Sequence, residues 1–404
     1  MSWPRVPLCE VATLEREGEL PSSLSADTPY IGLEHIDGDG TLCTSATVGS
    51  AELKSTKFHF CAEHVLFGKL RPYLRKIARP DFEGVCSTDI IPIRAGKRLD
   101  RAFLFHFLRS PSMVSLATSR CSGANLPRLS PTQLESFEVP VPPLPEQKRI
   151  AAILDSADAL RAKRRASIDQ LDALVQSTFL EMFGDPVMNP KGFPVRSLSE
   201  LYIDPNEGTK CGPFGSALKK EEYVQAGVPV WNMDNISPQG RVVMPFRMWV
   251  TAKKYCELEA YAVHDGDVLI SRAGTVGKMC VANTGGLKSI LSTNLIRVRF
   301  GRNLLPLYFV SLMTYCKGRV GRLEAGPDGA FTHMSTKVLD RLTFPYPPLD
   351  LQTHFAAIVE AIEQQRARLK AHLAELDALF ASLQSRAFSG EICSRSVSRQ
   401  HSSA

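Results

Sequence analysis

The sequence lacks the long apolar segments and paired metal ligands that mark several classes of protein. Nowhere in its 404 residues is there an apolar run of about 18, the length that a membrane helix needs, and residues 1–5 do not begin a signal-peptide core. The ten cysteines are scattered singly, with no Cys-x-x-Cys pair, and no two histidines have metal-ligand spacing. We therefore expect a cytoplasmic protein with free thiols and no metal site.

The bulk composition sets only wide limits on function. Hydrophobic residues make up 44% and charged residues 22% of the chain, as in ordinary globular proteins. The net charge of +6 is a mild basic excess. A phosphate-rich partner such as nucleic acid is compatible with this charge, and so is a slightly basic protein with no such partner.

What the sequence does contain is an internal repeat at an offset of 205 residues. Pro-Leu-Pro-Glu-Gln at 143–147 corresponds to Pro-Leu-Asp-Leu-Gln at 348–352, and Ala-Ala-Ile at 151–153 is repeated at 356–358. Each string opens a helical stretch that follows a larger globular stretch. Two similar halves of this size predict a molecule that binds two similar partners or sites.

Apolar residues in both helical stretches step alternately by four and three, which is the spacing of a coiled-coil seam. Arg161 and Arg366 interrupt the two seams at matching repeat positions. A lone helix would expose this stripe, so we expect the two helices to pack against each other within the chain, in either orientation, although a separate partner for each helix is the alternative. The predicted seam comprises Ile150, Leu154, Ile168, Leu171 and Val175, then Phe355, Val359, Ile362, Leu369, Leu373, Leu376 and Phe380.

The repeat and the helix ends divide the chain into five segments. Gly184 and Pro186 end the first helix, because glycine favours a left-handed cap and proline blocks continuation. The globular segments mix β-branched runs with helical patterns, which predicts an α/β (α+β) fold. The segments are a globular domain at 1–142, a helix at 143–186, a second globular domain at 187–346, a second helix at 347–391 and a serine-rich, disordered tail at 392–404.

The sequence resembles the specificity subunits of type I restriction-modification systems over nearly its whole length. The strings at 142–147 and 347–352, where the two helices start, carry this resemblance, together with Gly-Lys-Leu-Arg-Pro-Tyr-Leu-Arg-Lys at 68–76, Cys-Gly-Pro-Phe-Gly-Ser at 211–216 and Ser-Arg-Ala-Gly-Thr-Val-Gly at 271–277. Their order, combined with the duplicated helices, is typical of that family.

The resemblance implies a division of labour among subunits. Each globular domain would be a target recognition domain that reads one half of a split DNA sequence, and the antiparallel helices would be a spacer that docks two methyltransferase subunits. Those partners would bind S-adenosylmethionine and methylate adenine at N6, while a motor-nuclease subunit would cut unmarked DNA with ATP and Mg²⁺. Asp350 and Leu351 stand where the first helix start has Pro145 and Glu146, so docking at the starts of the two helices is expected to differ in detail.

The chain lacks the loops that those chemical steps would need. The nearest string to an Asn/Asp-Pro-Pro-Tyr/Phe methyltransferase loop, Tyr-Pro-Pro-Leu at 346–349, has neither end residue, and Gly-Lys-Met at 277–279 is not a phosphate-binding loop. Asp265 and Asp267 beside a glycine are typical of a turn rather than of a nuclease. We therefore predict a non-catalytic subunit that binds no cofactor itself.

Residues that contact DNA should supply cations for phosphates and polar side chains for base edges. A solvated strand edge or an ordinary turn is the alternative interpretation of each cluster. In the first domain the candidates are Lys69, Arg71, Tyr73, Arg75, Lys76, Arg79, Arg120, Asn125 and Arg128. In the second domain they are Lys210, Lys219, Lys220, Arg272, Thr275, Lys278, Arg319, Arg322 and His333.

Two other functions stay open at this stage. A coiled-coil scaffold without DNA reading would use the helices but would leave the duplicated domains without a purpose. A self-contained DNA methyltransferase or nuclease would need catalytic residues that the sequence does not display.

Overall fold

A computed structural model describes residues 3–43, 46–123, 125–214, 217–272, 276–316 and 334–391. The chain divides into two compact units, one of Met1–Arg165 with Ala371–Ala404 and one of Ala166–Lys370. Each unit thus combines one globular domain with part of both long helices. Within the described residues, no helix has both the length and the apolar character needed to cross a membrane.

The first unit is built on two four-stranded sheets. The main antiparallel sheet has the order β2 (Ala12–Leu14), β9 (Ile90–Ala95), β6 (His64–Gly68) and β7 (Ile77–Ala78). The second sheet has the order β3 (Gly18–Glu19), β5 (Lys57–Phe60), β8 (Gly84–Ser87) and β4 (Tyr30–Ile31), with β4 parallel to β8. A further pair joins β1 (Arg5–Pro7) to β10 (Glu138–Pro140) just before the first long helix.

Three short helices follow the main sheet of the first unit: α1 (Arg101–Leu108), α2 (Pro111–Ser119) and α3 (Pro131–Glu135). Asp100, Ser110 and Ser130 cap them, each accepting a hydrogen bond from a backbone N–H in the first turn. Strand β6 is buried along its whole length, which requires cover on both faces of the sheet. Phe103 of α1 packs in this core together with residues of both long helices.

The second unit repeats this plan. Its main sheet has the order β12 (Thr209–Cys211), β18 (Leu295–Val298), β15 (Val268–Ser271) and β16 (Met279–Val281), which matches the order in the first unit strand for strand. Strand β13 (Val228–Trp231) lies parallel to β17 (Ile290–Leu291) and antiparallel to β14 (Trp249–Val250), as β4 lies parallel to β8. The predicted repeat and the α/β fold class are therefore confirmed.

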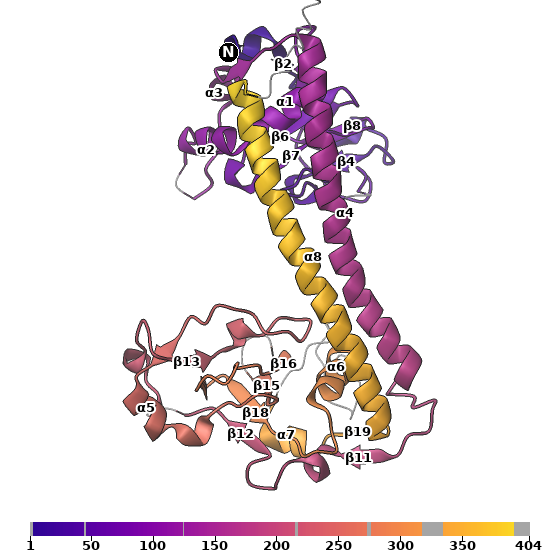
Figure 1. Cartoon of the computed structure of the whole chain (residues 1–404). Coiled ribbons are helices and arrows are strands. Elements are labelled where there is room, and N and C mark those ends of the chain that lie inside the picture. Colours follow the sequence, from indigo (N-terminus) through magenta and orange to yellow (C-terminus); the bar gives the residue numbers. More distant parts are fainter. Residues whose placement is uncertain are drawn as a thin grey trace, which may run out of the picture. The chain divides into compact units, whose positions relative to one another are not determined.

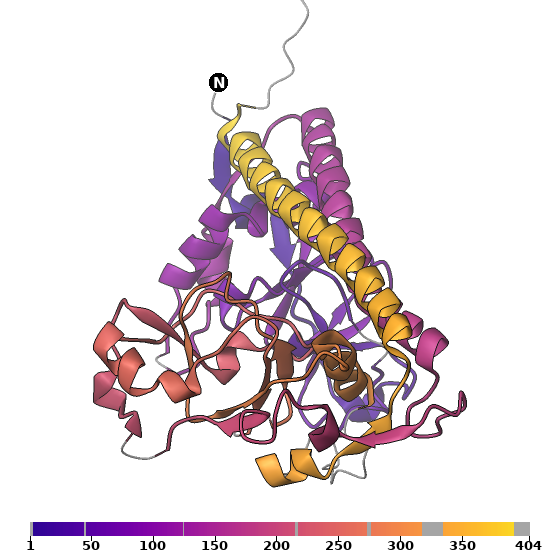
Figure 2. The same ribbon diagram turned by 60° about the horizontal axis from the view of Figure 1, so that its bottom comes forward.

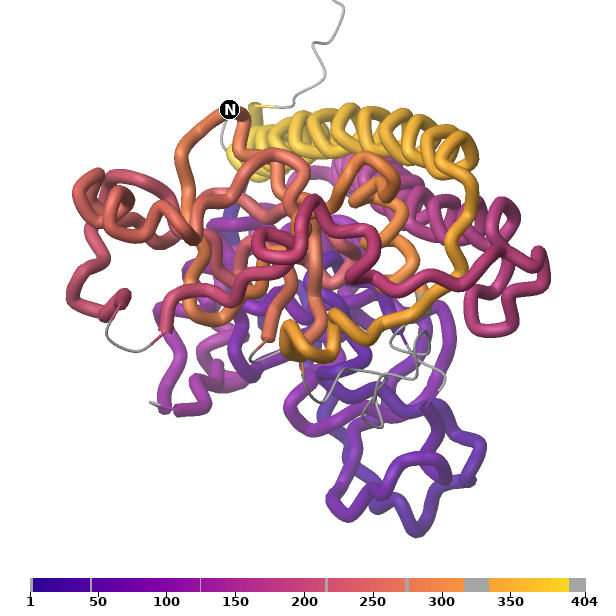
Figure 3. The backbone as a smooth tube through the Cα atoms, turned by 90° about the horizontal axis from the view of Figure 1, so that it is seen from below, coloured from indigo at the N-terminus to yellow at the C-terminus, as the bar shows by residue number. Residues whose placement is uncertain are grey.

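The second unit also repeats the approach to its long helix. Strand β11 (Val195–Ser197) pairs with β19 (Thr343–Pro345) just before that helix, as β1 pairs with β10. Its short helices are α5 (Ala252–Glu257), α6 (Pro306–Cys316) and α7 (Thr336–Asp340). Figure 3 follows the backbone through this unit, coloured from pink to orange. Trp231 is fully buried, as expected for a core residue rather than a base-stacking one.

The long helices are α4 (Leu144–Phe183), of 40 residues, and α8 (Leu349–Ser389), of 41 residues. At about 1.5 Å per residue each is about 60 Å long. In the first unit the last turns of α8 lie beside the first turns of α4 (Figures 1 and 2). In the second unit Phe183, at the end of α4, packs edge-on against Phe355 near the start of α8, with ring centroids 5.3 Å apart. The two helices are thus antiparallel, as predicted.

Each unit contains an ion pair between α4 and α8, and the residues of the two pairs correspond in the 205-residue repeat. In the first unit Arg161 of α4 pairs with Asp377 of α8 at 2.6 Å. In the second unit Arg366 of α8, the repeat partner of Arg161, pairs with Asp172 of α4, the repeat partner of Asp377. Each unit therefore contains the same type of contact between the long helices, with the roles of α4 and α8 exchanged. The polar breaks in the predicted seam therefore hold the two helices together.

The predicted seam is buried or partly buried at all of its positions, from Ile150 to Phe380. Continued beyond Val175, the four-three alternation would select Thr178 and Met182, but the residues that are buried at the end of α4 are Phe179 and Phe183. Steps of four keep these rings on the side that faces Tyr308 and Phe355. A straight helix with 3.6 residues per turn drifts away from a strict heptad, and here it follows the domain core.

Candidate nucleic-acid interface

The segment between β6 and β7 brings several of the predicted DNA contacts together in the first unit. Arg71 and Arg75 have left-handed backbone conformations, with φ of 50° and 56°. The Arg71 N–H donates to the Pro127 carbonyl at 2.8 Å, and the Leu129 N–H donates to the Lys69 carbonyl at 2.9 Å. Two clusters that lie far apart in the sequence therefore form one surface. Backbone strain held by such ties is a feature of functional loops.

The charged groups of this surface are only partly neutralised. Asp89 lies 3.9 Å from the Lys69 ammonium and 3.2 Å from the Arg128 guanidinium, so one carboxylate serves two cations. The Tyr73 side chain is 49% exposed. Lys76 is half-buried, and Asn125 is exposed. Arg120 is also exposed, while it donates to the Ser136 hydroxyl and stacks on Phe137.

Arg75 and Arg79 are engaged within the unit instead. The Arg79 guanidinium pairs with Asp155 of α4 at 2.5 Å and lies over the Phe105 ring. Burial raises the pKa of Asp155, but hydrogen bonds from His106 and Arg79 outweigh it and bring this pKa to about 2. Arg75 donates to the Arg109 carbonyl at 3.3 Å. Contact between either arginine and DNA stays a prediction, and it would have to compete with these bonds.

The second unit presents a related set of cations among its described residues. The Arg272 N–H donates to the Asn294 carbonyl at 3.0 Å, as the Lys69 N–H does to Asp89 in the first unit, and its guanidinium lies over the Phe214 ring. Lys210 lies 5.9 Å from the centre of the Tyr261 ring. The remaining described candidates are Lys219 and Lys220, which are exposed, and Lys278, which is half-buried. Thr275, Arg319, Arg322 and His333 lie outside the described residues.

Each globular domain rests on the long helices through an equivalent tight turn. The Asp37 N–H donates to the Thr41 carbonyl in the first unit, and the Ser237 N–H donates to the Arg241 carbonyl in the second, both at 2.9 Å. Gly40 and Gly240 have φ of 88° and 79° within these turns. A Cβ at Gly240 would come within 2.9 Å of Val310 of α6, so glycine allows the turn to approach α6 closely.

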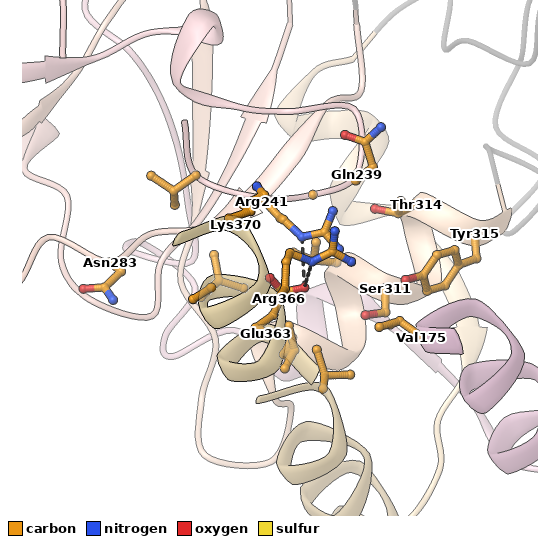
Figure 4. Close-up of a pocket in the computed structure, with 17 residues that line it drawn as sticks. Val175, Gln239, Arg241, Asn283, Ser311, Thr314, Tyr315, Glu363, Arg366 and Lys370 are labelled. Carbon is orange, nitrogen blue, oxygen red and sulfur yellow. Dashed lines mark hydrogen bonds and ion pairs between the residues drawn. The ribbon is translucent and has the colours of Figure 1, made fainter. Parts of the chain in front are cut away.

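The charges of the two turns are reversed. In the first unit Asp39 of the turn faces Arg165 of α4 at 3.8 Å. In the second unit the neutral Ser237 and Gln239 stand where the first turn has Asp37 and Asp39. Arg241, at the position of Thr41, pairs with Asp172 of α4 at 2.5 Å and Glu363 of α8 at 2.9 Å. Figure 4 shows Arg241 and Arg366 converging on Glu363. The sequence did not reveal this difference, because the repeat was identified from the residues that its two halves share.

Replacing Asp172 with alanine should destabilise the second unit by about 2 kcal/mol. The change removes the carboxylate that accepts from both Arg241 and the buried Arg366. Loss of one member of a buried pair costs about 3–5 kcal/mol, and less is expected here because the Asp172 side chain is 38% exposed. Urea unfolding followed by tryptophan fluorescence measures the effect, since Trp231 and Trp249 lie in this unit.

The matched control for this variant is Asp169→Ala, an exposed carboxylate on the same helix. We expect its unfolding midpoint to stay close to that of the unmodified protein. Equal midpoints for the two variants would show that the Asp172 pairs contribute nothing to stability.

A buried glutamine ties each globular domain to its long helix. The Gln147 side chain accepts from the Asp100 N–H at 2.7 Å and donates to the carbonyls of Arg98 and Pro142. Its repeat partner Gln352 accepts from the Leu305 N–H at 3.0 Å and donates to the Pro347 carbonyl at 3.0 Å. Both glutamines are fully buried, so the repeated string at the helix start has an internal structural role.

Part of the chain matches a known family, and several known proteins are similar to it. Residues 2–170 match the family model of the type I restriction modification DNA specificity domain. Over 187 residues the chain is 28% identical to the type I restriction enzyme EcoDI specificity subunit of Escherichia coli, a match that covers 45% of this chain and 41% of that relative. The chain is thus similar to type I specificity subunits, and its residues 2–170 match their DNA specificity domain.

Other proteins match a longer part of the chain. The MjaVIII specificity subunit of Methanocaldococcus jannaschii is 23% identical over 297 residues, which cover 70% of this chain and 68% of that protein. The type I system S subunit from M. genitalium has a TM-score of 0.57 at 16% identity, with 96% of both chains covered. A chain from a structure on assembly and conformational transition of the type I R-M system also has a TM-score of 0.57, at 23% identity, with 97% of this chain and 98% of that chain covered. The two structural matches show a shared fold.

Proposed function

We propose that this protein is the non-catalytic, DNA-reading specificity subunit of a type I restriction-modification complex. The match of residues 2–170 to a DNA specificity domain carries this proposal. The second globular domain lies outside that match. It is included in the proposal because its fold repeats that of the first domain. Its main sheet has the same strand order, and it has the same parallel strand pair and the same glutamine tie. Each domain would therefore read one half of a bipartite DNA target.

The surface beside the β6–β7 segment is the proposed contact with DNA in the first unit. Arginine and lysine side chains would neutralise phosphates, while Tyr73 and Asn125 are exposed and could reach base edges. The corresponding surface in the second unit includes Arg272, Lys219 and Lys220. Base choice would then depend on side chains that differ between the two domains, so the two half-sites should have different sequences.

The antiparallel helices would act as the spacer and as the docking site for two methyltransferase subunits. A helix of about 60 Å exceeds one turn of DNA, which is about 34 to 36 Å, and this supports two half-sites separated by unread bases. The reciprocal Arg161–Asp377 and Arg366–Asp172 pairs support two equivalent docking sites. Leu160, Leu174 and Leu379 are about half exposed on these helices, and such apolar side chains suit a protein interface.

The chemistry would belong to the partner subunits. The methyltransferase subunits would bind S-adenosylmethionine and methylate adenine, and a motor-nuclease subunit would use ATP and Mg²⁺. We expect the purified chain alone to transfer no methyl groups to DNA from labelled S-adenosylmethionine, and the chain with its methyltransferase subunits to do so.

Exchange of one domain tests whether the halves are read separately. Replacing residues 1–140 with those of a relative should change one half of the methylated motif and leave the other half intact. Single-molecule methylation sequencing of a strain that carries the hybrid and its methyltransferase gives both halves at once. A motif altered in both halves, or in neither, would contradict separate reading. The reverse hybrid, with the second domain exchanged, is the matched control and should alter the opposite half.

A further inference from the structure

The turn between β5 and β6 of the first unit brings a thiol, an imidazole, a carboxylate and a guanidinium into mutual contact. The Cys61 sulfur lies 3.3 Å from Nδ1 of His64, and Nε2 of the same ring lies 2.7 Å from the Glu15 carboxylate. The Arg94 guanidinium donates to the Cys61 sulfur at 3.5 Å and also pairs with Glu15. A nucleophile therefore contacts a base, and a third group orients that base, which is the arrangement of an activated thiol.

A backbone contact decides which nitrogen of His64 carries the proton. The Cys61 N–H donates to Nδ1 at 2.9 Å, so Nδ1 is an acceptor and the ring proton lies on Nε2, which donates it to Glu15. The His64 side chain is only 3% exposed, and the surrounding atoms hold its ring in this orientation. The unprotonated nitrogen is therefore the one that faces the thiol.

The charges beside the sulfur favour its thiolate form. The hydrogen bond between Arg94 and Glu15 lowers the pKa of the carboxyl and raises the pKa of the guanidinium, so both groups stay ionised at neutral pH. Glu63 also pairs with Arg94, but its side chain is 74% exposed and solvent screens its charge. Arg94 makes its bond to the sulfur in addition to these pairs, and a cation at this distance stabilises a thiolate.

The thiol lies at the wall of a cavity that has a volume of about 500 Å³. Cys61 is half-buried, so part of the residue is accessible to solvent. His64, Glu15 and Arg94 line the same cavity, together with residues of β5 and of the 24–29 segment. A molecule as small as hydrogen peroxide can therefore reach the sulfur beside its base and its cation.

The second unit shows that the same turn can form without these groups. There Asp267 stands at the position of His64, and the His264 N–H donates to its carboxylate at 2.7 Å. Asp267 also pairs directly with Arg299, the counterpart of Arg94, at 2.7 Å. A carboxylate is thus enough to close the turn and to hold the arginine. The imidazole and the thiol of the first unit are not required for that structural role.

We propose that Cys61 is a reactive thiol that hydrogen peroxide oxidises to a sulfenic acid. The sulfur attacks one peroxide oxygen, so that an S–O bond forms and the O–O bond breaks. His64 passes the thiol proton to the leaving oxygen, and the products are the sulfenic acid and water. The sulfur loses two electrons and the peroxide gains them. The reaction needs this chain alone and does not rest on the proposed function.

Treatment of the full-length chain with hydrogen peroxide and dimedone, which traps sulfenic acids, tests the proposal. Mass spectrometry of the cysteine peptides gives the labelling rate of each thiol. Cys43 is an internal control, because its hydrogen bond to Asp37 raises the pKa of its thiol. We expect Cys61 to be labelled about tenfold faster than Cys43 and faster than Cys256, although both of these are more exposed. Labelling of Cys61 no faster than that of Cys256 would overturn the proposal.

Two variants separate the reactivity of the thiol from the fold of the turn. His64→Asp copies the arrangement of the second unit, so the turn should form, but labelling of Cys61 should fall to the rate of Cys256. Glu15→Gln keeps an acceptor for His64 and removes the charge that stabilises a protonated ring, so it should slow labelling as well. Glu17→Gln, at an exposed position of the same segment, is the control and should leave the rate unchanged.

The pH dependence of the labelling rate gives a second readout. In the unmodified chain the rate at Cys61 should change little between about pH 6.5 and 8.5, whereas the rate at Cys256 should rise with the thiolate fraction. Circular dichroism shows which variants are folded, and Glu15→Gln decides the matter if His64→Asp is not. Folded variants that are labelled as fast as the unmodified chain would show that these neighbours do not activate Cys61, and the proposal would be wrong.

Discussion

Inserting seven residues into each long helix should lengthen the unread part of the methylated motif by about three base pairs. One heptad adds about 10.5 Å to an α-helix, and DNA rises about 3.4 Å per base pair. The heptad returns each helix nearly to its original phase, so the seam between the helices is preserved. Methylation of the original motif should fall to background, because its half-sites no longer match the separation of the two domains.

The contacts on α4 and α8 decide where the insertion has to be made. Asp155 and Arg165 bind the first domain, and Asp172 binds the second, so a change at these residues would damage docking. Between them, Arg164 contacts His372, and Arg366 contacts the Ile168 carbonyl. Insertions after residues 166 and 370 fall between these two contacts and leave all of the domain contacts intact.

Methylation sequencing of a strain that carries the double insertion measures the new motif. Both half-sites should keep their sequences, since neither domain is altered. An insertion in α4 alone is the control, and it should abolish methylation because the two seams no longer match in length. An unchanged motif in the double insertion would mean that the helices do not set the spacing.

Replacing Gln147 with alanine should destabilise the first unit by about 3 kcal/mol. The change removes the acceptor of the Asp100 N–H, which lies at the start of α1, and the donor to two carbonyls. A buried group left without its partner costs about 1–3 kcal/mol, and the small cavity adds about 1 kcal/mol. Because Gln147 joins α1 to α4, the loss should also loosen the domain on its helix.

Urea unfolding followed by circular dichroism gives the size of this effect, and hydrogen exchange of the α1 amides locates it. Gln352→Ala should have the same effect on the second unit, with a slightly smaller magnitude because Gln352 has one donor bond fewer. Gln176→Ala, at an exposed position of α4, is the control for helix propensity and should leave the midpoint unchanged. A loss of stability in Gln176→Ala equal to that in Gln147→Ala would contradict the proposed tie.

Much of the architecture could be predicted because it depends on patterns along the chain. Periodic apolar residues select a helix and the face that it buries, whatever that face touches. The 205-residue repeat predicted two equal folds, and the parallel pairs β4–β8 and β13–β17 confirm them. The same repeat placed Arg161 and Arg366 at equivalent positions before their partners were known.

The candidate interface was less predictable, because the sequence does not show whether a charged side chain faces solvent or another part of the protein. Arg79 looked like a DNA contact beside Lys76, yet its guanidinium meets Asp155, a residue of α4 that lies far along the chain. The 69–76 and 120–128 clusters became one surface only through the backbone bonds of Arg71 and Leu129.

By itself, the sequence determined the two-fold repeat, the two long helices and the absence of recognisable catalytic loops. The tertiary structure alone decided the different charges of the 37–41 and 237–241 turns and the glutamine ties. The physical reason is the range of the interactions. Periodicity and helix ends are set by neighbours a few residues apart, whereas ion pairs and buried amides depend on partners that only folding brings within hydrogen-bond distance.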